Sequence, residues 1–301
     1  MGGRWRAGTA AAVAVVATFV PAASAGAAAP IVAAAGDIAC APGDPVTPTA
    51  CRQLATSNLF VANPAIKAIL PLGDEQYETG ALADFQQAYA ASWGRSLGKT
   101  HPVPGNHEYA GGANGTGYFD YFGSRAGARG KGWYSFTVGS WHLIALNANC
   151  THVGGCGPSS PQVAWLRSDL AAHHPACTLA YWHQARFSSG PQGNLSDYDT
   201  FWKVLYNHGV DVVLSGHDHD YERYALQTPA RVRDPKHGIR EFVVGTGGKS
   251  LDPFTGPFTN GQFRQNAQFG ILKLTLHRHR YEWRFVSTAK HVLDSGQTDC
   301  H

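Results

Sequence analysis

Two histidines separated by one residue are the first candidates for chemistry in this 301-residue chain. His217 and His219 follow an apolar run at 210–214 that reads as a buried strand and ends at Gly216. Because side chains at positions i and i+2 of extended backbone point to the same side, both imidazoles can face one site. The pair is compatible with metal chelation and equally with two ordinary surface or packed histidines. A metal site therefore requires ligands from elsewhere in the chain.

Other side chains able to bind metal occupy the same position, at the ends of predicted strands. Taken singly, an Asp or Asn beside glycine is a common turn residue. Their recurrence at several strand ends favours one shared site, because ligands of open α/β sheets gather beyond the carboxyl ends of strands. Carboxylate, amide and imidazole donors suit iron, zinc or manganese. The residues concerned are Asp37, Asp74 with Tyr77, Asn106 with His107, His183, and the pair His217 and His219.

The elements that position these residues alternate between strand and helix over the first two-thirds of the chain. Strands are expected at 31–35, 65–70, 178–183 and 210–215, and helices at 51–61, 81–93, 161–170 and 197–208. A hairpin is expected at 133–138 and 140–146, a loop at 110–117, and further strands at 241–244, 271–276 and 281–286. This order predicts an α/β fold in which two packed β-sheets are flanked by helices.

The N-terminus has the pattern of a targeting segment. Arg4 and Arg6 precede an apolar run at 10–20, and Ala23-Ser24-Ala25 offers a cleavage site with small residues. We expect a signal peptide at 1–25, a short linker at 26–30 and one catalytic domain at 31–301. No later segment approaches about 18 uninterrupted apolar residues, so we expect a secreted, soluble protein without a membrane span.

Six cysteines follow the expected cleavage site, and an even number in a secreted chain indicates disulfides. None of their spacings is a CxxC pair, so a structural zinc site is not expected. The count alone leaves several connectivities open. Proximity in sequence suggests Cys40 with Cys51 and Cys150 with Cys156, which leaves Cys177 for Cys300.

Charge adds little to the functional reading. The net charge is +3, and no run of Lys or Arg is long enough to follow a nucleic-acid backbone. The basic stretch at 277–280 is read as a solvated strand face or hairpin rather than a second metal site. Residues 245–249 resemble a phosphate-binding loop only loosely, because the Walker spacing is missing.

The ordered motifs resemble those of the calcineurin-like metallophosphoesterases, and most closely the purple acid phosphatases. The similar stretches are Gly36-Asp37, 73–77, 105–108, His183 and 216–223, so they span most of the mature chain. Many members of the superfamily have Asp-x-His in the first motif, whereas Ala39 stands at that position here. Tyr77, three residues after Asp74, is the compensating residue typical of purple acid phosphatases. The resemblance implies a four-layer α-β-β-α sandwich.

The resemblance also implies two metal ions bridged by Asp74. Fe(III) would be held by Asp37, Asp74, Tyr77 and His219. The divalent ion, which would be Zn, Fe or Mn, would be held by the set Asp74, Asn106, His183 and His217. Tyrosinate favours ferric iron because a strongly Lewis-acidic ion can hold a phenol in its deprotonated form. Tyr77 could instead simply pack in the core.

The reaction implied is hydrolysis of phosphomonoesters by direct attack of metal-bound hydroxide, without a covalent phosphoenzyme. His107 would contact the phosphoryl oxygens or protonate the leaving group, and Glu108 would orient it; alternatively, His107 braces its loop. Asn106, His107 and Arg186 are the expected substrate-binding residues. Several purple acid phosphatases have further histidines after the fourth motif, but residues 184–189 contain none. Arg186 would replace their positive charge or lie at the rim.

Three functional alternatives remain at this point. The first is a phosphatase acting on small-molecule phosphomonoesters, and the second is a phosphodiesterase or nucleotidase on the same scaffold. The third is a metal-dependent binding protein without turnover. The natural substrate, the divalent ion and the oligomeric state are left open by the sequence.

Overall fold

The computed structural model describes residues 1–10, 28–112 and 114–301. Most of the predicted signal peptide and part of the predicted linker lie outside the described residues. None of the helices in the described ranges is both long and apolar enough to cross a membrane.

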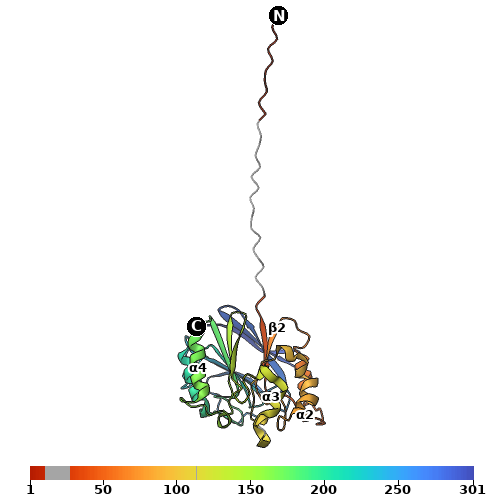
Figure 1. The fold of residues 1–301 in the computed structure, drawn as a ribbon, viewed down its shortest axis with the longest axis vertical. Coiled ribbons are helices and arrows are strands. Elements are labelled where there is room, and N and C mark those ends of the chain that lie inside the picture. The colour runs from red at the N-terminus through yellow and green to blue at the C-terminus, as the bar shows by residue number, and fades with distance from the viewer. Residues whose placement is uncertain (11–27, 113) are drawn as a thin grey trace.

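Two β-sheets form the centre of the fold (Figure 1). The five-stranded sheet has the order β12-β11-β10-β1-β2, and the seven-stranded sheet has the order β3-β4-β5-β6-β8-β7-β9. The first contains β1 (Ile31–Ala35), β2 (Ile66–Pro71), β10 (Gly270–Leu276), β11 (Arg280–Ser287) and β12 (Val292–Asp299). The second contains β3 (Tyr134–Val138), β4 (Trp141–Ala145), β5 (Cys177–Gln184), β6 (Val212–Gly216), β7 (Tyr221–Tyr224), β8 (Arg240–Val244) and β9 (Gly261–Gln265).

Helices cover the outer faces of the sheets. Figure 1 shows α4 on one side of the molecule and α2 with α3 on the other. The α-helices are α1 (Gln53–Ser57), α2 (Leu82–Asp84) with its continuation η1 (Phe85–Tyr89), α3 (Thr116–Phe122), α4 (Pro161–Ala172) and α5 (Asp199–Asn207). Segments of 3-10 helix are η2 (Trp93–Lys99), η3 (His107–Gly112), η4 (Gly123–Ala126), η5 (Cys150–His152) and η6 (Ser196–Tyr198).

Alternating residues of the central strands supply two separate cores. In β6, Val212 and Leu214 belong to the core between the sheets, together with Leu272 of the other sheet. Val213 faces the opposite way and belongs to the core beneath the helices, with Leu166 of α4. A strand buried on both faces reads as a continuous apolar run, which is how this segment appears in the sequence. The predicted α/β fold with two packed sheets and flanking helices is confirmed.

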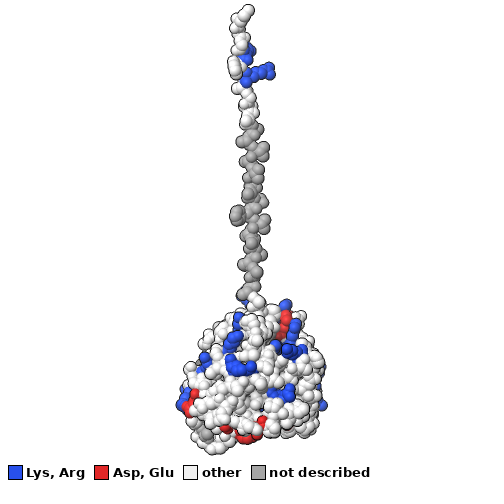
Figure 2. Space-filling view, turned by 90° about the vertical axis from the view of Figure 1, so that its right-hand side faces the viewer, with Lys and Arg blue, Asp and Glu red and all other residues white. Residues whose placement is uncertain are grey.

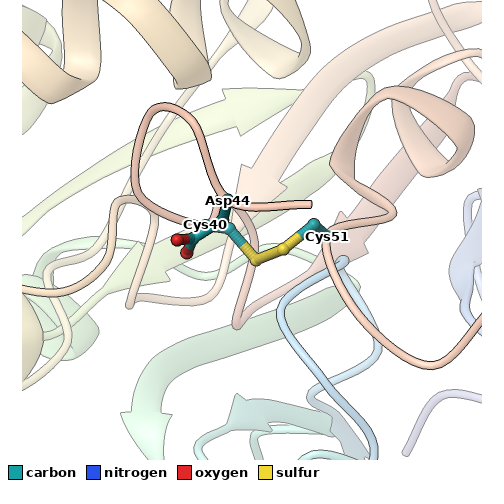
Figure 3. A group of neighbouring side chains, drawn as sticks. All are labelled: Cys40, Asp44 and Cys51. Atoms are coloured by element: carbon teal, nitrogen blue, oxygen red, sulfur yellow. A yellow bond between two sulfur atoms is a disulfide. The ribbon is translucent and has the colours of Figure 1, made fainter. Parts of the chain in front are cut away.

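All three suggested disulfides are confirmed. The Cα–Cα distances are 5.3 Å for Cys40–Cys51, 5.2 Å for Cys150–Cys156 and 5.6 Å for Cys177–Cys300. Figure 3 shows the first bridge with Asp44 beside it. Because both sulfur atoms are bonded to each other, this group of three side chains offers no thiolate to a metal ion.

Some element predictions were wrong. The expected loop at 110–117 contains the end of η3 and the start of α3. The expected helix at 51–61 is regular only at Gln53–Ser57. Strand β12 was missed because most of its residues are polar and exposed, as suits an edge strand with one free side.

Basic side chains do not form one continuous stripe on the face shown in Figure 2. The Lys and Arg residues there are separated by uncharged surface.

Candidate metal centre

The predicted ligands converge where parallel strands of the two sheets end. Asp37 follows β1 and Asp74 follows β2, which lie side by side in parallel. His183 lies near the end of β5, and His217 and His219 follow β6, its parallel neighbour. Sequence-distant loops therefore meet because parallel strands deliver their carboxyl ends to one edge.

One half of the centre is formed around the hydroxyl of Tyr77. The phenol oxygen lies 3.0 Å from Asp37 Oδ1, 3.1 Å from Asp74 Oδ2 and 3.0 Å from His219 Nε2. A phenol carries a single hydrogen, so it cannot donate to both carboxylates at once. A cation among these oxygen and nitrogen atoms would remove the mismatch between donors and acceptors.

The other half contains Asp74, His183 and His217, whose potential ligand atoms all lie within 4.8 Å of one another. His183 Nε2 lies 3.1 Å from Asp74 Oδ2 and 3.2 Å from His217 Nδ1. The Nδ1 atom of His183 is 2.7 Å from the Leu72 carbonyl and donates to it. In the neutral imidazole this hydrogen bond leaves Nε2 with a free lone pair, as a metal ligand requires.

Asp74 lies between the two halves. Its Oδ2 atom contacts both the Tyr77 hydroxyl and His183 Nε2, while its Oδ1 atom accepts the His107 backbone N–H at 2.9 Å. This geometry is compatible with a carboxylate shared between two ions.

The backbone at the centre adopts uncommon conformations. Asp37, Asp74 and His217 have φ values of 60°, 48° and 75°, a region that non-glycine residues rarely occupy. Gly105 lies so close to the site that a Cβ atom there would be 2.1 Å from Asp74 Oδ1. Glycine is therefore required at 105 to let residues 105–108 approach residues 73–77.

The protonation equilibria of the centre reflect a concentration of buried carboxylates. Burial opposes charge on His183, but Asp74 outweighs it and raises the pKa of His183 to about 9. Burial, followed by the charges of Asp37 and Asp74, raises the pKa of Tyr77 well above 10. Burial would raise the pKa of Asp37, yet the nearby His219 lowers it below its ordinary value. The buried carboxylates Asp37 and Asp74 therefore concentrate negative charge at a place where bound cations would be stabilised.

Asn106 adds an oxygen atom that could serve as a metal ligand. Its Oδ1 atom is buried and has no hydrogen-bond partner among the described residues. A buried carbonyl oxygen without a partner carries a desolvation cost that a cation would remove. The carboxylate, phenol, amide and imidazole donors together fit two metal ions of the iron, zinc or manganese type.

His107 is placed beside the centre rather than within it. Its ring packs on Tyr77 with centroids 4.2 Å apart, and its Nε2 atom is 3.9 Å from Asp74 Oδ2. Its Nδ1 atom lies 2.6 Å from the carbonyl of Glu78. The ring is therefore oriented by a backbone carbonyl that sequence reasoning did not identify.

Glu108 is bonded to the backbone of two neighbouring loops. Its carboxylate accepts backbone N–H groups from Asp74 at 2.9 Å, Gly105 at 2.7 Å and Gln76 at 3.1 Å. Burial, with the charge of Asp74, raises its pKa to about 7. Glu108 thus ties residues 73–77 to residues 105–108 through their backbone, and its expected role in orienting the His107 ring stays a prediction.

Arg186 is engaged away from the predicted ligands. Its guanidinium pairs with Asp199 and lies over the Phe187 ring at 4.4 Å from the centroid. Substrate binding by Arg186 stays a prediction. Another residue that sequence reasoning missed is Ser250, whose hydroxyl lies 2.7 Å from His219 Nδ1 and fixes that ring.

Comparisons with known proteins agree with this geometry. The family model for calcineurin-like phosphoesterases matches residues 32–221. Purple acid phosphatase 15 of Arabidopsis thaliana is 31% identical over 150 residues, which cover 44% of this chain and 27% of that protein. A Mycobacterium tuberculosis protein described as uncharacterized is 31% identical over 186 residues, covering 50% of this chain and 35% of that one.

Solved structures show the same fold. Purple acid phosphatase PPD1 from yellow lupin seeds aligns with a TM-score of 0.76 at 20% identity, over 90% of this chain and 53% of that chain. GAP50, described as the anchor in the inner membrane complex of Plasmodium, aligns with a TM-score of 0.66 at 16% identity, over 91% and 90% of the two chains.

The curated relatives are matched over only part of their length, whereas the family model matches most of this chain. The chain spans only 27% to 38% of the length of the curated relatives. The family match, by contrast, covers the strands and loops that carry the candidate ligands, and the similar proteins support the purple acid phosphatase branch. The chain belongs to the calcineurin-like phosphoesterase family.

Proposed function

We propose that the protein is a secreted, binuclear metal-dependent phosphatase that hydrolyses phosphomonoesters. The observation that carries the proposal is the position of Asp74 Oδ2, 3.1 Å from the Tyr77 hydroxyl and 3.1 Å from His183 Nε2. A carboxylate between two separate donor groups is suited to hold a pair of cations close together.

The two donor groups would hold different ions. Asp37, Tyr77 and His219 form a site for Fe(III), and Asn106, His183 and His217 form a site for a divalent ion, with Asp74 common to both. When bound, such ions supply Lewis acidity toward the phosphoester and toward the attacking water.

His107 is the residue proposed to act on substrate directly. Its Nδ1 atom is held by the Glu78 carbonyl, so Nε2 is the ring atom left to contact a phosphoryl oxygen or the leaving oxygen. In the protonated imidazole, Nε2 can donate a hydrogen bond or deliver a proton to the leaving alkoxide. The ring is 29% exposed, which gives substrate access to it.

Export of the protein rests on two features. The N-terminal pattern is that of a signal peptide, and three disulfides join the six cysteines. Detection of the mature chain in the medium, beginning after Ala25, is the expected result. Retention of the full chain inside the cell would contradict export.

Turnover must be separated from binding, because the fold alone does not imply catalysis. The fold shared with GAP50, described as an anchor, illustrates the point. Steady-state assays on p-nitrophenyl phosphate and bis(p-nitrophenyl) phosphate should show a higher kcat/KM for the monoester. A higher value for the diester would favour a phosphodiesterase. Negligible turnover of both by protein holding two metal ions would favour a binding protein.

A further inference from the structure

A pocket of about 330 Å³ opens beside the candidate metal centre and includes Asn106 in its wall. Because Asn106 is also a proposed ligand, a group bound in this pocket lies next to the reacting phosphoester. Its lining includes Asn106, Tyr109, His152, Gln184, Asp197 and Tyr198.

Gln184 provides an unsatisfied hydrogen-bond acceptor in this wall. The residue is 8% exposed, and its Oε1 atom is buried without a hydrogen-bond partner among the described residues. Leaving such an oxygen unpaired is costly, and a turn of the Gln184 amide toward the pocket would let a ligand hydroxyl donate to it and remove that cost.

The charge of the pocket excludes some occupants. None of the described residues that line it is Lys or Arg; the lining offers the His152 imidazole and the Asp197 carboxylate. A second phosphate group in this position would find no strong cation and would face the charge of Asp197. The lining therefore favours a neutral ligand.

The pocket is held in shape by the surrounding structure. The Cys150–Cys156 disulfide closes the loop that carries His152, and the His152 ring packs on Tyr109 with centroids 4.7 Å apart. The Tyr109 hydroxyl accepts from Asn147 Nδ2 at 2.8 Å, and the Tyr198 hydroxyl donates to the Ala148 carbonyl at 3.1 Å. These bonds hold both tyrosine rings in place, and preformed walls of this kind favour binding.

We propose that this pocket receives the leaving group of the phosphoester, and that the leaving group is a neutral alcohol bearing additional hydroxyls, such as a polyol or a sugar. Gln184 accepts a hydrogen bond from one of those hydroxyls, and Asp197 disfavours leaving groups that carry a second phosphate. This inference rests on the proposed phosphatase activity.

The first experiment compares two substrates of equal carbon number. Wild-type protein should show a kcat/KM for glycerol 3-phosphate about tenfold above that for propyl phosphate, which lacks the hydroxyls. Gln184→Leu should bring this ratio close to one, with metal content measured in parallel. Gln297→Leu, at an exposed position on β12, is the matched control and should keep the wild-type ratio. Equal ratios in wild type and Gln184→Leu would overturn the assignment.

A second experiment uses an exposed residue, whose substitution does not threaten folding. Asp197→Lys should raise kcat/KM for glucose 1,6-bisphosphate relative to glucose 6-phosphate by about tenfold, because the repulsive charge is reversed. An unchanged ratio would contradict the role of Asp197. If the protein turns over p-nitrophenyl phosphate but neither Gln184→Leu nor Asp197→Lys changes its substrate ratio, the pocket assignment alone is overturned. Absence of turnover on every monoester would overturn both it and the proposed function.

Discussion

The Tyr77 hydroxyl lies 3.0 Å from Asp37 Oδ1 and 3.1 Å from Asp74 Oδ2, although a phenol has one hydrogen to donate. The two aspartates follow neighbouring parallel strands, so the contact joins two consecutive motifs of the chain. A cation at this point would satisfy both carboxylates and the phenol oxygen together.

Tyr77→Phe should bleach protein loaded with iron. We expect the iron-loaded wild type to absorb visible light through charge transfer from tyrosinate to Fe(III). A phenyl ring cannot supply this transition. The check is an absorption spectrum of both proteins at equal iron content. Persistence of the colour in Tyr77→Phe would rule out this residue as its source.

His107→Ala should lower kcat by about 10²- to 10⁴-fold, the usual contribution of a positioned proton donor. Both metal ions should be retained, because His107 contacts Asp74 through its backbone N–H and is outside the proposed ligand sets. Metal analysis and steady-state kinetics on p-nitrophenyl phosphate provide the measurement, with the exposed His291→Ala as the control. If His107→Ala instead loses metal or stability while kcat per bound metal pair changes little, His107 braces its loop and does not act on substrate.

Asp211 should make the folded state less stable as the pH rises from about 4 to about 7. Burial raises the pKa of its carboxyl from 3.8 to about 7. Hydrogen bonds from the backbone N–H groups of Thr178 at 2.8 Å and His301 at 3.0 Å act in the opposite direction but are outweighed. The His301 ring faces it at 3.4 Å. Between these pH values the folded chain retains a proton that the unfolded chain has lost, so unfolding becomes easier.

The comparison of wild type with Asp211→Asn isolates this effect. Over that pH range the wild type should lose at most about 4 kcal/mol of stability relative to the variant, from a shift of about three pKa units. Urea unfolding at several pH values is the measurement. A difference between the two proteins that stays constant with pH would contradict the raised pKa.

Loss of the Cys177–Cys300 bridge should destabilise the fold by about 2 to 5 kcal/mol. The bridge closes a long loop, with a sequence separation of 123 residues, and joins the C-terminus to the start of β5. Denaturant unfolding of the Cys177→Ser/Cys300→Ser double variant provides the test. Cys150→Ser/Cys156→Ser, which opens a separation of 6 residues, should cost less stability. A larger loss in the short-loop variant would contradict this ordering.

The ligand-bearing strand ends could be predicted because one physical rule governs them. Buried parallel strands are visible as apolar runs, and their carboxyl ends must share an edge, so Asp37, Asp74, His183 and the His217/His219 pair could be brought together in advance. His217 and His219 begin as a single chelating pair in sequence. In the structure they diverge, with His217 against His183 and His219 against Tyr77 and Asp37.

The supporting contacts could not be predicted, because they join segments without a periodic pattern. Glu108 binds the backbone of the second motif, 32 and 34 residues earlier, and no spacing rule connects them. His152 lines the pocket beside the metal centre from a loop that the Cys150–Cys156 disulfide closes. This loop lies outside the five motifs that resemble the family. Strand β12 lacks apolar alternation because its edge position leaves polar residues exposed.

The most direct test of the binuclear centre is metal analysis of wild type and Asp74→Ala, combined with turnover of p-nitrophenyl phosphate. Wild-type protein should contain two metal ions per chain, and Asp74→Ala should lose both ions or about a thousandfold in kcat/KM, because the shared carboxylate is gone. Asp44→Ala, an exposed aspartate outside the proposed ligand sets, should retain both ions. Two bound ions with normal turnover in Asp74→Ala would contradict the account.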